Sequence, residues 1–203
     1  VRSMFSFRDI THDTQTTYRL AADEQTVFFL HNRGGNISFE LTGPRAEAHI
    51  FALFDLALDD RIESSIHQIH QAPETVSSFT GRSLLSDAAA CDWKGSLSLS
   101  KDAPRSSGHQ EMRHLLLSPD AKAFSLPSLE IETDDVRCGH AATMSAPDPE
   151  QLFFLRSRGL SEPAAISLIA QGFSHNLFEK IRALGIDFPV PETTHSKKRM
   201  RIS

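Results

Sequence analysis

The chain has 203 residues and a mass of 22.5 kDa, which allows one sizeable domain or two small ones. Its 21 basic and 26 acidic residues give a net charge of −5. This balance argues against general nucleic-acid binding, which needs a basic face to displace phosphate counterions. No apolar run of about 18 residues predicts a membrane span, and no leader-like segment opens the sequence, so we expect a cytoplasmic protein.

Short apolar runs alternate with turn signals through the middle of the chain, at intervals of roughly 14–17 residues. Ile37, Phe39 and Leu41 form one such run, and the next extends from Ala48 to Leu58, with its apolar residues expected on one face. This rhythm predicts an all-β body from about residue 15 to 146. The lack of Asn-Gly or Asp-Gly hairpins favours a solenoid such as a parallel β-helix, although the pattern alone leaves a β-sandwich equally open.

The spacing becomes helical at Asp148, which is placed to cap a helix with Pro149 at its first position and Gly159 at its end. A second helix is expected from Ser161, loosened midway by Gly172. Its apolar stripe consists of Ile166, Ile169, Phe173, Leu177, Ile181 and Leu184. The expected parts of the chain are a β-helix core, a C-terminal helical region and a polar tail, over residues 1–147, 148–188 and 189–203.

Cys138 and His140 are the one adjacent pair of metal-binding residue types in the sequence. Side chains two positions apart in an extended segment face the same way, so the thiol and the imidazole are expected side by side. Both groups are suitable ligands for iron, iron–sulfur clusters or zinc. An ordinary core face is the alternative, and its members would be Val136, Cys138, His140, Ala142 and Met144.

The other candidate ligands have simpler interpretations. His67 and His70 lie three apart with no third ligand nearby, and we expect them to be exposed or partly buried strand residues. Cys91, close to Trp93, is expected to be a buried structural cysteine. No established zinc, nucleophile or phosphate-binding motif is present, and two cysteines are too few for a disulfide framework.

Four blocks of sequence, at residues 109–118 (HQEMRHLLLS), 127–131 (PSLEI), 134–143 (DDVRCGHAAT) and 152–160 (LFFLRSRGL), resemble one known family. They are similar to the SufB/SufD scaffold proteins of the SUF iron–sulfur cluster assembly system. The Cys-x-His element is closer to the SufD type, because Ala141 follows His140 where SufB-type members carry a His-Glu pair.

The resemblance implies a right-handed parallel β-helix followed by a C-terminal helical region, which favours the β-helix over the sandwich. It implies a non-enzymatic scaffold in which Cys138 and His140 contribute ligands to a transient iron–sulfur cluster. A low-pKa thiolate would aid both sulfur acceptance and iron ligation. Further ligands would come from a second copy or a SufB-like partner paired through the β-helix, near residues 109–146. The helical region would dock a SufC-like ABC-type ATPase, and the candidate contacts are Leu152, Phe153, Phe154, Leu155, Arg156 and Arg158.

The sequence is also compatible with two other functions. A structural paralogue would bind the ATPase without any metal. A β-helix enzyme acting on polysaccharides would need facing carboxylates in a groove, and sequence alone cannot place such a pair.

Overall fold

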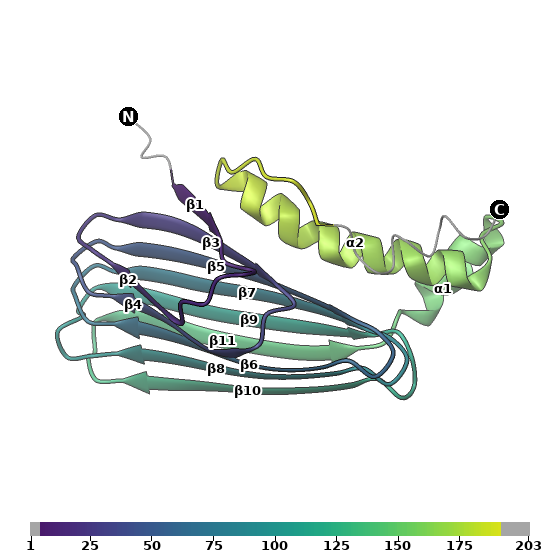
Figure 1. Cartoon of the computed structure of the whole chain (residues 1–203), viewed down its shortest axis with the longest axis horizontal. Helices are drawn as coiled ribbons and strands as arrows, with labels where there is room; N and C mark the ends of the chain where they lie inside the picture. The colour runs from purple at the N-terminus through teal and green to yellow at the C-terminus, as the bar shows by residue number, and fades with distance from the viewer. Residues whose placement is uncertain (1–4, 192–203) are drawn as a thin grey trace.

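The computed structural model describes residues 5–191, which form a parallel β-solenoid followed by two helices (Figure 1). The strands are β1 (Ser6–Asp9), β2 (Thr17–Leu20), β3 (Gln25–His31), β4 (Gly35–Leu41), β5 (Glu47–Leu56), β6 (Arg61–His70), β7 (Val76–Leu85), β8 (Ala90–Leu99), β9 (Ser106–Leu116), β10 (Lys122–Ile131) and β11 (Val136–Ser145). The helices are α1 (Pro149–Ser157) and α2 (Glu162–Ala183). The predicted mainly β chain with C-terminal helices is confirmed, whereas most of the predicted polar tail lies outside the described residues.

The solenoid is flattened into two sheets, with strand orders β1-β3-β5-β7-β9-β11 and β10-β8-β6-β4-β2 (Figure 1). Each coil gives one strand to each sheet, and every strand pairing among the described residues is parallel. Ile37 pairs with Ile66 and Ile66 pairs with Gly95, so these coils repeat after 29 residues. The turn interval in the sequence therefore corresponds to half a coil, and the parallel pairing excludes a sandwich of antiparallel strands.

Left-handed turn residues stack along the solenoid. Arg45 and Arg105 both have positive φ values and pair with acidic residues of the preceding coil, Asp23 and Glu74. Leu58 also has a positive φ, of 59°, and is 70% exposed. The expectation that the apolar run of β5 includes Leu58 was wrong, because the strand ends at Leu56 and the chain turns before Leu58 reaches the core.

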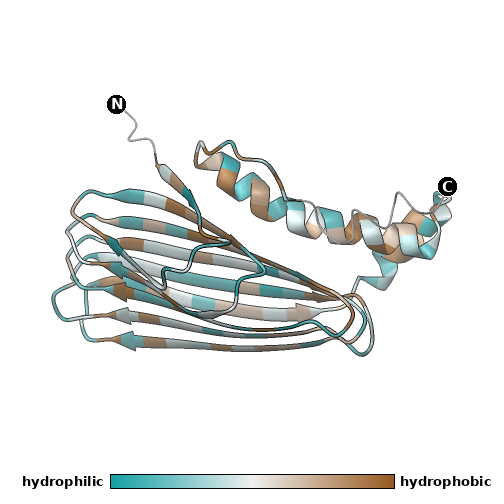
Figure 2. Ribbon diagram, in the orientation of Figure 1, coloured by the Kyte–Doolittle hydropathy of each residue, from teal (hydrophilic) through white to brown (hydrophobic). Residues whose placement is uncertain are grey.

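The main core fills the space between the two sheets. Figure 2 shows hydrophobic and hydrophilic residues alternating along many of the strands. Phe79 stacks on Trp93 with ring centroids 5.1 Å apart and planes 10° from parallel. Cys91 is fully buried in this core, and burial raises the pKa of its thiol to about 12. Cys91 is thus a structural cysteine, as its surroundings in the sequence predicted.

Buried polar side chains form hydrogen-bonded chains inside the apolar core. His70 is fully buried, with its ring nitrogens 2.7 Å from the hydroxyls of Thr75 and Ser77. His67, on the outer face of the same strand, is only partly buried and lies 2.6 Å from Ser96 Oγ. The prediction of exposed or partly buried histidines holds for His67 but was wrong for His70, because residues three apart on a strand face opposite sides.

Two buried histidines should make the fold sensitive to mild acid. Burial lowers the pKa of His70 and of His114 to about 4, whereas an unfolded histidine titrates near 6.5. The unfolded state therefore binds more protons below pH 6.5, and stability that is complete above that pH is lost as the pH falls towards 4. We expect the free energy of unfolding in urea to fall by about 2 kcal/mol per histidine between pH 7.5 and pH 5.

The exposed His175 is the control for this acid effect, since its side chain is 60% accessible. His175→Gln should leave the pH dependence unchanged. Equal unfolding free energies at pH 7.5 and pH 5 for the unaltered chain would show that the two buried rings tolerate protonation.

Helix α2 covers the outer face of the six-stranded sheet (Figures 1 and 2). Leu177 and Ile181 pack with Phe29 and Phe51 in a second apolar cluster, separate from the core between the sheets. A third cluster joins the middle of α2 to β7 and β9. The apolar stripe of α2 therefore packs on the solenoid, and much of it is unavailable to a partner.

Gly172 does not interrupt α2, which is continuous from Glu162 to Ala183. A Cβ atom added at Gly172 would meet nothing within 4 Å. Gly172→Ala should therefore stabilise the chain by about 0.5–1 kcal/mol, as expected when alanine replaces glycine inside a helix. Urea denaturation measures this gain, and a loss of stability would mean that the helix needs glycine here.

Gly95→Ala is the contrasting variant, because its Cβ would lie 2.4 Å from the Trp93 ring and 2.7 Å from Gln110 Oε1. It should destabilise the chain by about 1–3 kcal/mol through overpacking.

Neither of the two described helices has the length and the apolar composition that a membrane-spanning helix needs.

Candidate functional site

Cys138 and His140 lie on β11, the last strand of the six-stranded sheet (Figure 1). In the parallel register Cys138 is beside Gly108 and His140 is beside Gln110 on β9. Gln110 is fully buried, so this row of β11 faces the inside of the solenoid. Cys138 is half-buried and His140 is exposed.

The two ends of the solenoid differ in how they are covered. At the first coil Ile10 and Tyr18 are buried, and the Arg33 guanidinium donates hydrogen bonds to the Ile10 carbonyl and the Tyr18 hydroxyl. At the last coil β10 and β11 each pair along one edge only. The large apolar side chains left exposed on these two strands are Phe124, Leu126, Leu129, Ile131 and Met144, with accessibilities of 37–53%.

The open last coil bears on the core-face interpretation of the β11 row. His140, Ala142 and Met144 all face the interior side and yet are exposed, because no further coil of the described residues lies above them. Within this chain the row is therefore not an ordinary core face. Cys138 and His140 lie at the open end of the solenoid, where the core between the two sheets is not covered by a further coil of the described residues.

The surroundings of Cys138 do not favour the low-pKa thiolate that would aid iron ligation. Partial burial raises the pKa of Cys138, and a backbone hydrogen bond with Gly108 opposes this only in part. A metal ion binding there would have to displace the thiol proton.

The pair is also incomplete as a metal site. Nowhere within residues 5–191 do three or more His, Cys, Asp or Glu side chains come close enough to hold a metal ion. An iron–sulfur cluster normally takes about four protein ligands. Cys138 and His140 are only two residues, so the described part of the chain does not complete such a ligand set by itself.

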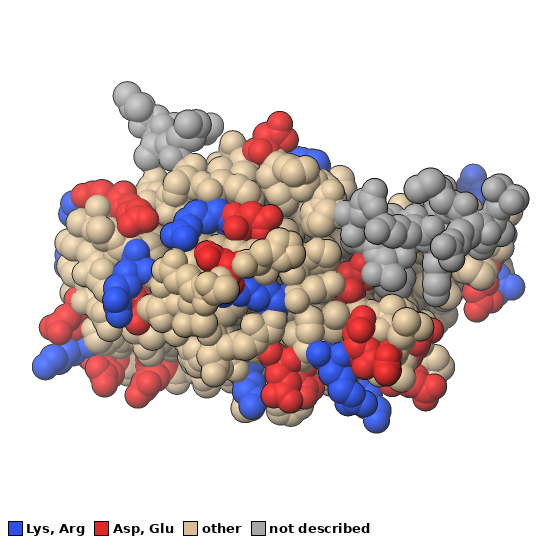
Figure 3. All heavy atoms as spheres, in the orientation of Figure 1, with Lys and Arg blue, Asp and Glu red and all other residues tan. Residues whose placement is uncertain are grey.

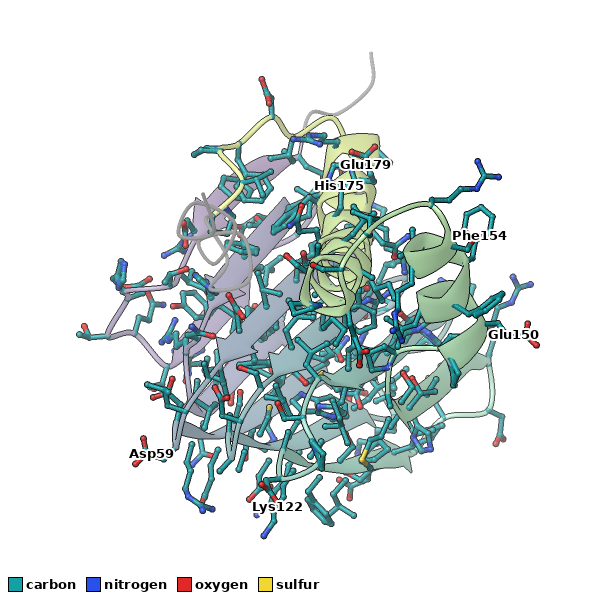
Figure 4. All side chains as sticks on the ribbon, turned by 90° about the vertical axis from the view of Figure 1, so that its right-hand side faces the viewer. Asp59, Lys122, Glu150, Phe154, His175 and Glu179 are labelled. Carbon is teal, nitrogen blue, oxygen red and sulfur yellow. The ribbon has the colours of Figure 1, made fainter. Side chains whose placement is uncertain are left out.

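The candidate docking residues lie on α1, whose first turn is capped by the Asp148 carboxylate accepting the Glu150 N–H. Phe153 is 76% exposed and Phe154 is 55% exposed. Figure 4 shows Phe154 and Glu150 pointing away from the sheets. The other predicted contacts are Leu152 and Leu155, which are half-buried, and Arg156 and Arg158, which are exposed.

A hollow lies between the two helices, and its rim is acidic. It is lined by Asp148, Glu150, Gln151, Phe154, Leu155, Leu168 and Ile169. Arg158 stacks over the Phe154 ring at 5.0 Å, and Arg156 pairs with Glu162 at 3.1 Å. The exposed Phe154 thus borders a concave surface formed by both helices.

A charged cluster around the buried Arg82 lies next to α2 and was not predicted from the sequence. Arg82 Nη1 on β7 lies 2.6 Å from Glu111 Oε1 on β9, and its side chain is only 2% exposed. Glu111 also lies 3.1 Å from Arg113 and 3.7 Å from Lys180 on α2. Burial alone would raise the pKa of Glu111, but these three cations lower it overall.

Charge on the rest of the surface is mixed. On the face shown in Figure 3, acidic and basic side chains alternate without a broad patch of one sign. A uniform basic surface for nucleic acid is not seen on that face.

The fold and the site define a β-solenoid with a helical layer on one sheet and a thiol–imidazole pair at its open end. Residues 31–173 match the family described as SUF system FeS cluster assembly, SufBD core domain. The chain therefore belongs to the SufBD family, as the four sequence blocks indicated.

Individual relatives cover parts of the chain. A SufBD family protein of Mycobacterium leprae is 31% identical over 154 residues, which is 72% of this chain and 39% of that protein. SufD of Escherichia coli is 33% identical over 105 residues, or 52% of this chain and 25% of that protein. A SufBD family protein of Mycobacterium tuberculosis is 29% identical over 133 residues, with 66% and 16% covered. The chain thus spans well under half the length of these relatives.

Proposed function

We propose that this chain is a non-catalytic scaffold subunit of a SUF-type system. In this role its open last coil pairs with a second chain, and Cys138 and His140 contribute ligands to an iron–sulfur cluster assembled between them. The cluster is the cargo of the scaffold. The observation that carries the proposal is that, within residues 5–191, both residues lie on the last coil, whose inward-facing row is partly exposed, whereas Ile10 and Tyr18 at the first coil are buried.

The open coil has the features of a pairing surface. Unpaired strand edges at β10 and β11 offer backbone groups to another chain, and natural proteins seldom leave such edges uncovered. The exposed side chains of Leu129, Ile131 and Met144 lie on the inward-facing rows of β10 and β11 and add apolar area at this end. Phe124 and Leu126 are exposed on the outer face of β10. A second copy would satisfy this surface with twofold symmetry, and a SufB-like partner is the other candidate.

The helices are the proposed docking site for a SufC-like ABC-type ATPase. The support is the exposure of Phe153 and Phe154 on α1, of which Phe154 lines the hollow between α1 and α2. Exposed aromatic residues in a concave surface are typical of binding hot spots. The α2 stripe cannot serve this purpose where it packs on the sheet.

Point variants test this docking better than removal of the helices. Deleting α2 would uncover Phe29 and Phe51, and the remaining solenoid would be prone to aggregate. The double variant Phe153→Ser and Phe154→Ser should keep the fold, since both side chains are exposed, and should weaken ATPase binding at least about tenfold by calorimetry. Leu58→Ser is the matched control, with a 70% exposed side chain on a solenoid turn. ATPase binding unchanged by the double variant would place the docking surface elsewhere.

A further inference from the structure

Gln110 lies next to the candidate ligand His140, one coil deeper in the solenoid. The two residues are register partners on β9 and β11, on the face that points inside. Neighbouring strands are about 4.8 Å apart, so a glutamine side chain can reach the imidazole of the next strand. Gln110 is fully buried, and it belongs to the sequence block at residues 109–118.

The hydrogen bonds around Gln110 fix the orientation of its side-chain amide. Gln110 Nε2 donates to Gln68 Oε1 at 2.9 Å. Gln68 Nε2 in turn lies 2.6 Å from Ser77 Oγ and 3.5 Å from the backbone carbonyl of His109. A carbonyl only accepts, so this atom of Gln68 is the nitrogen and its oxygen faces Gln110. The remaining heteroatom of Gln110 is therefore an oxygen, Oε1.

Gln110 Oε1 has no hydrogen-bond donor among residues 5–191. An unsatisfied buried acceptor is unfavourable, and a native structure normally provides a partner for it. Gly95 makes room for the oxygen, because a Cβ there would lie 2.7 Å from it. In the last coil Pro127 pairs with Gly95 and His140 pairs with Gln110. Proline has no N–H, so of these two residues of the last coil only His140 can donate a hydrogen bond to this oxygen.

We propose that Gln110 is a positioning residue for His140. Its Oε1 accepts the N–H of one ring nitrogen, and the other nitrogen keeps its lone pair for a metal ion. His140 is exposed, so its ring can rotate towards this oxygen. Such a bond fixes the tautomer and the ring plane of a histidine ligand. The role of His140 as a ligand rests on the proposed function, but its tautomer does not.

The structure offers one rival donor. Trp93 Nε1 is buried and likewise has no partner among the described residues. The Trp93 ring lies close to Gly95, on the side where Gln110 Oε1 is found. A test must therefore observe both the imidazole and the indole.

Nitrogen-15 NMR of the full chain without metal makes this distinction. Long-range proton–nitrogen correlations in mildly alkaline buffer report the tautomer of His140, assigned with His140→Gln. The ratio of the two tautomers should differ about five- to tenfold from that of a free histidine side chain in the same buffer, the change that one ordinary hydrogen bond produces. Gln110→Met, similar in size but without the amide, should return the ratio to that of the free side chain. Leu97→Ala is the control for core destabilisation, since Leu97 is fully buried in the neighbouring strand β8, and it should leave the ratio unchanged.

A tautomer ratio in the unaltered chain equal to that of a free histidine side chain would overturn the proposal without recourse to any variant. A ratio that survives Gln110→Met, or a Trp93 indole resonance that shifts while His140 does not, would also overturn it. Iron binding is a separate measurement, in which Gln110→Met should weaken affinity about 10- to 100-fold. A Gln110-dependent tautomer in a chain that binds no iron would leave the positioning role intact and refute the proposed function of the site.

Discussion

Glu111→Gln is expected to destabilise the chain by about 3–5 kcal/mol, the usual cost of leaving one buried charge without its partner. Arg82 is 2% exposed, and the carboxylate of Glu111 is its counter-ion at 2.6 Å. Without that carboxylate, the buried Arg82 would keep only the two partly exposed cations Arg113 and Lys180 as charged neighbours. Urea denaturation at neutral pH measures the loss.

The control is Glu74→Gln, which breaks the exposed pair with Arg105. Surface pairs contribute about 0–1 kcal/mol, so this variant should be nearly neutral. The double variant Arg82→Met with Glu111→Gln should recover part of the loss, because it removes the unpaired charge. Similar small losses from Glu111→Gln and Glu74→Gln would show that the cluster is hydrated and does not hold α2.

Cys138→Ser is expected to abolish the iron–sulfur absorbance obtained after anaerobic reconstitution with iron and sulfide. Cys138 is the accessible thiol of the described residues, and a serine hydroxyl is a poor substitute for a thiolate ligand. His140→Ala should weaken the absorbance without a large change in unfolding free energy, because the His140 side chain is exposed.

Cys91→Ala provides the matched control. Cys91 is buried, and the pKa of its thiol is raised to about 12, so it should contribute no ligand. This variant should retain most of the absorbance while losing some stability through the cavity it creates. Equal loss from Cys138→Ser and Cys91→Ala would refute Cys138 as the specific ligand.

The fold could be predicted from the sequence because its coils repeat local signals. Turn residues recur at each half coil, and alternating runs such as Ile37, Phe39 and Leu41 mark the strands without any knowledge of pairing. Pattern alone did not separate the solenoid from a sandwich, since both have the same alternation. The resemblance of residues 109–160 to known scaffolds favoured the solenoid, and parallel pairing confirms it.

The site was only partly predictable for a different physical reason. Spacing indicated that Cys138 and His140 share a face, but exposure of that face depends on whether another coil follows. The shifted pKa of Cys138 and the cluster around Glu111 depend on contacts between segments far apart in the chain. Neither propensity nor periodicity encodes such contacts. Arg82 was one indication of this cluster that was not used, because it is a charged residue inside a strand whose other residues are largely buried.

The central claim is that the open last coil forms a cluster site between two chains. Anaerobic native mass spectrometry of the reconstituted protein, alone and with a SufB-like partner, measures chain number and bound cluster in the same ion. We predict cluster mass on species with two chains, lost when Cys138 is replaced by serine. A cluster carried by a single chain, or a paired species whose cluster survives Cys138→Ser, would contradict the account.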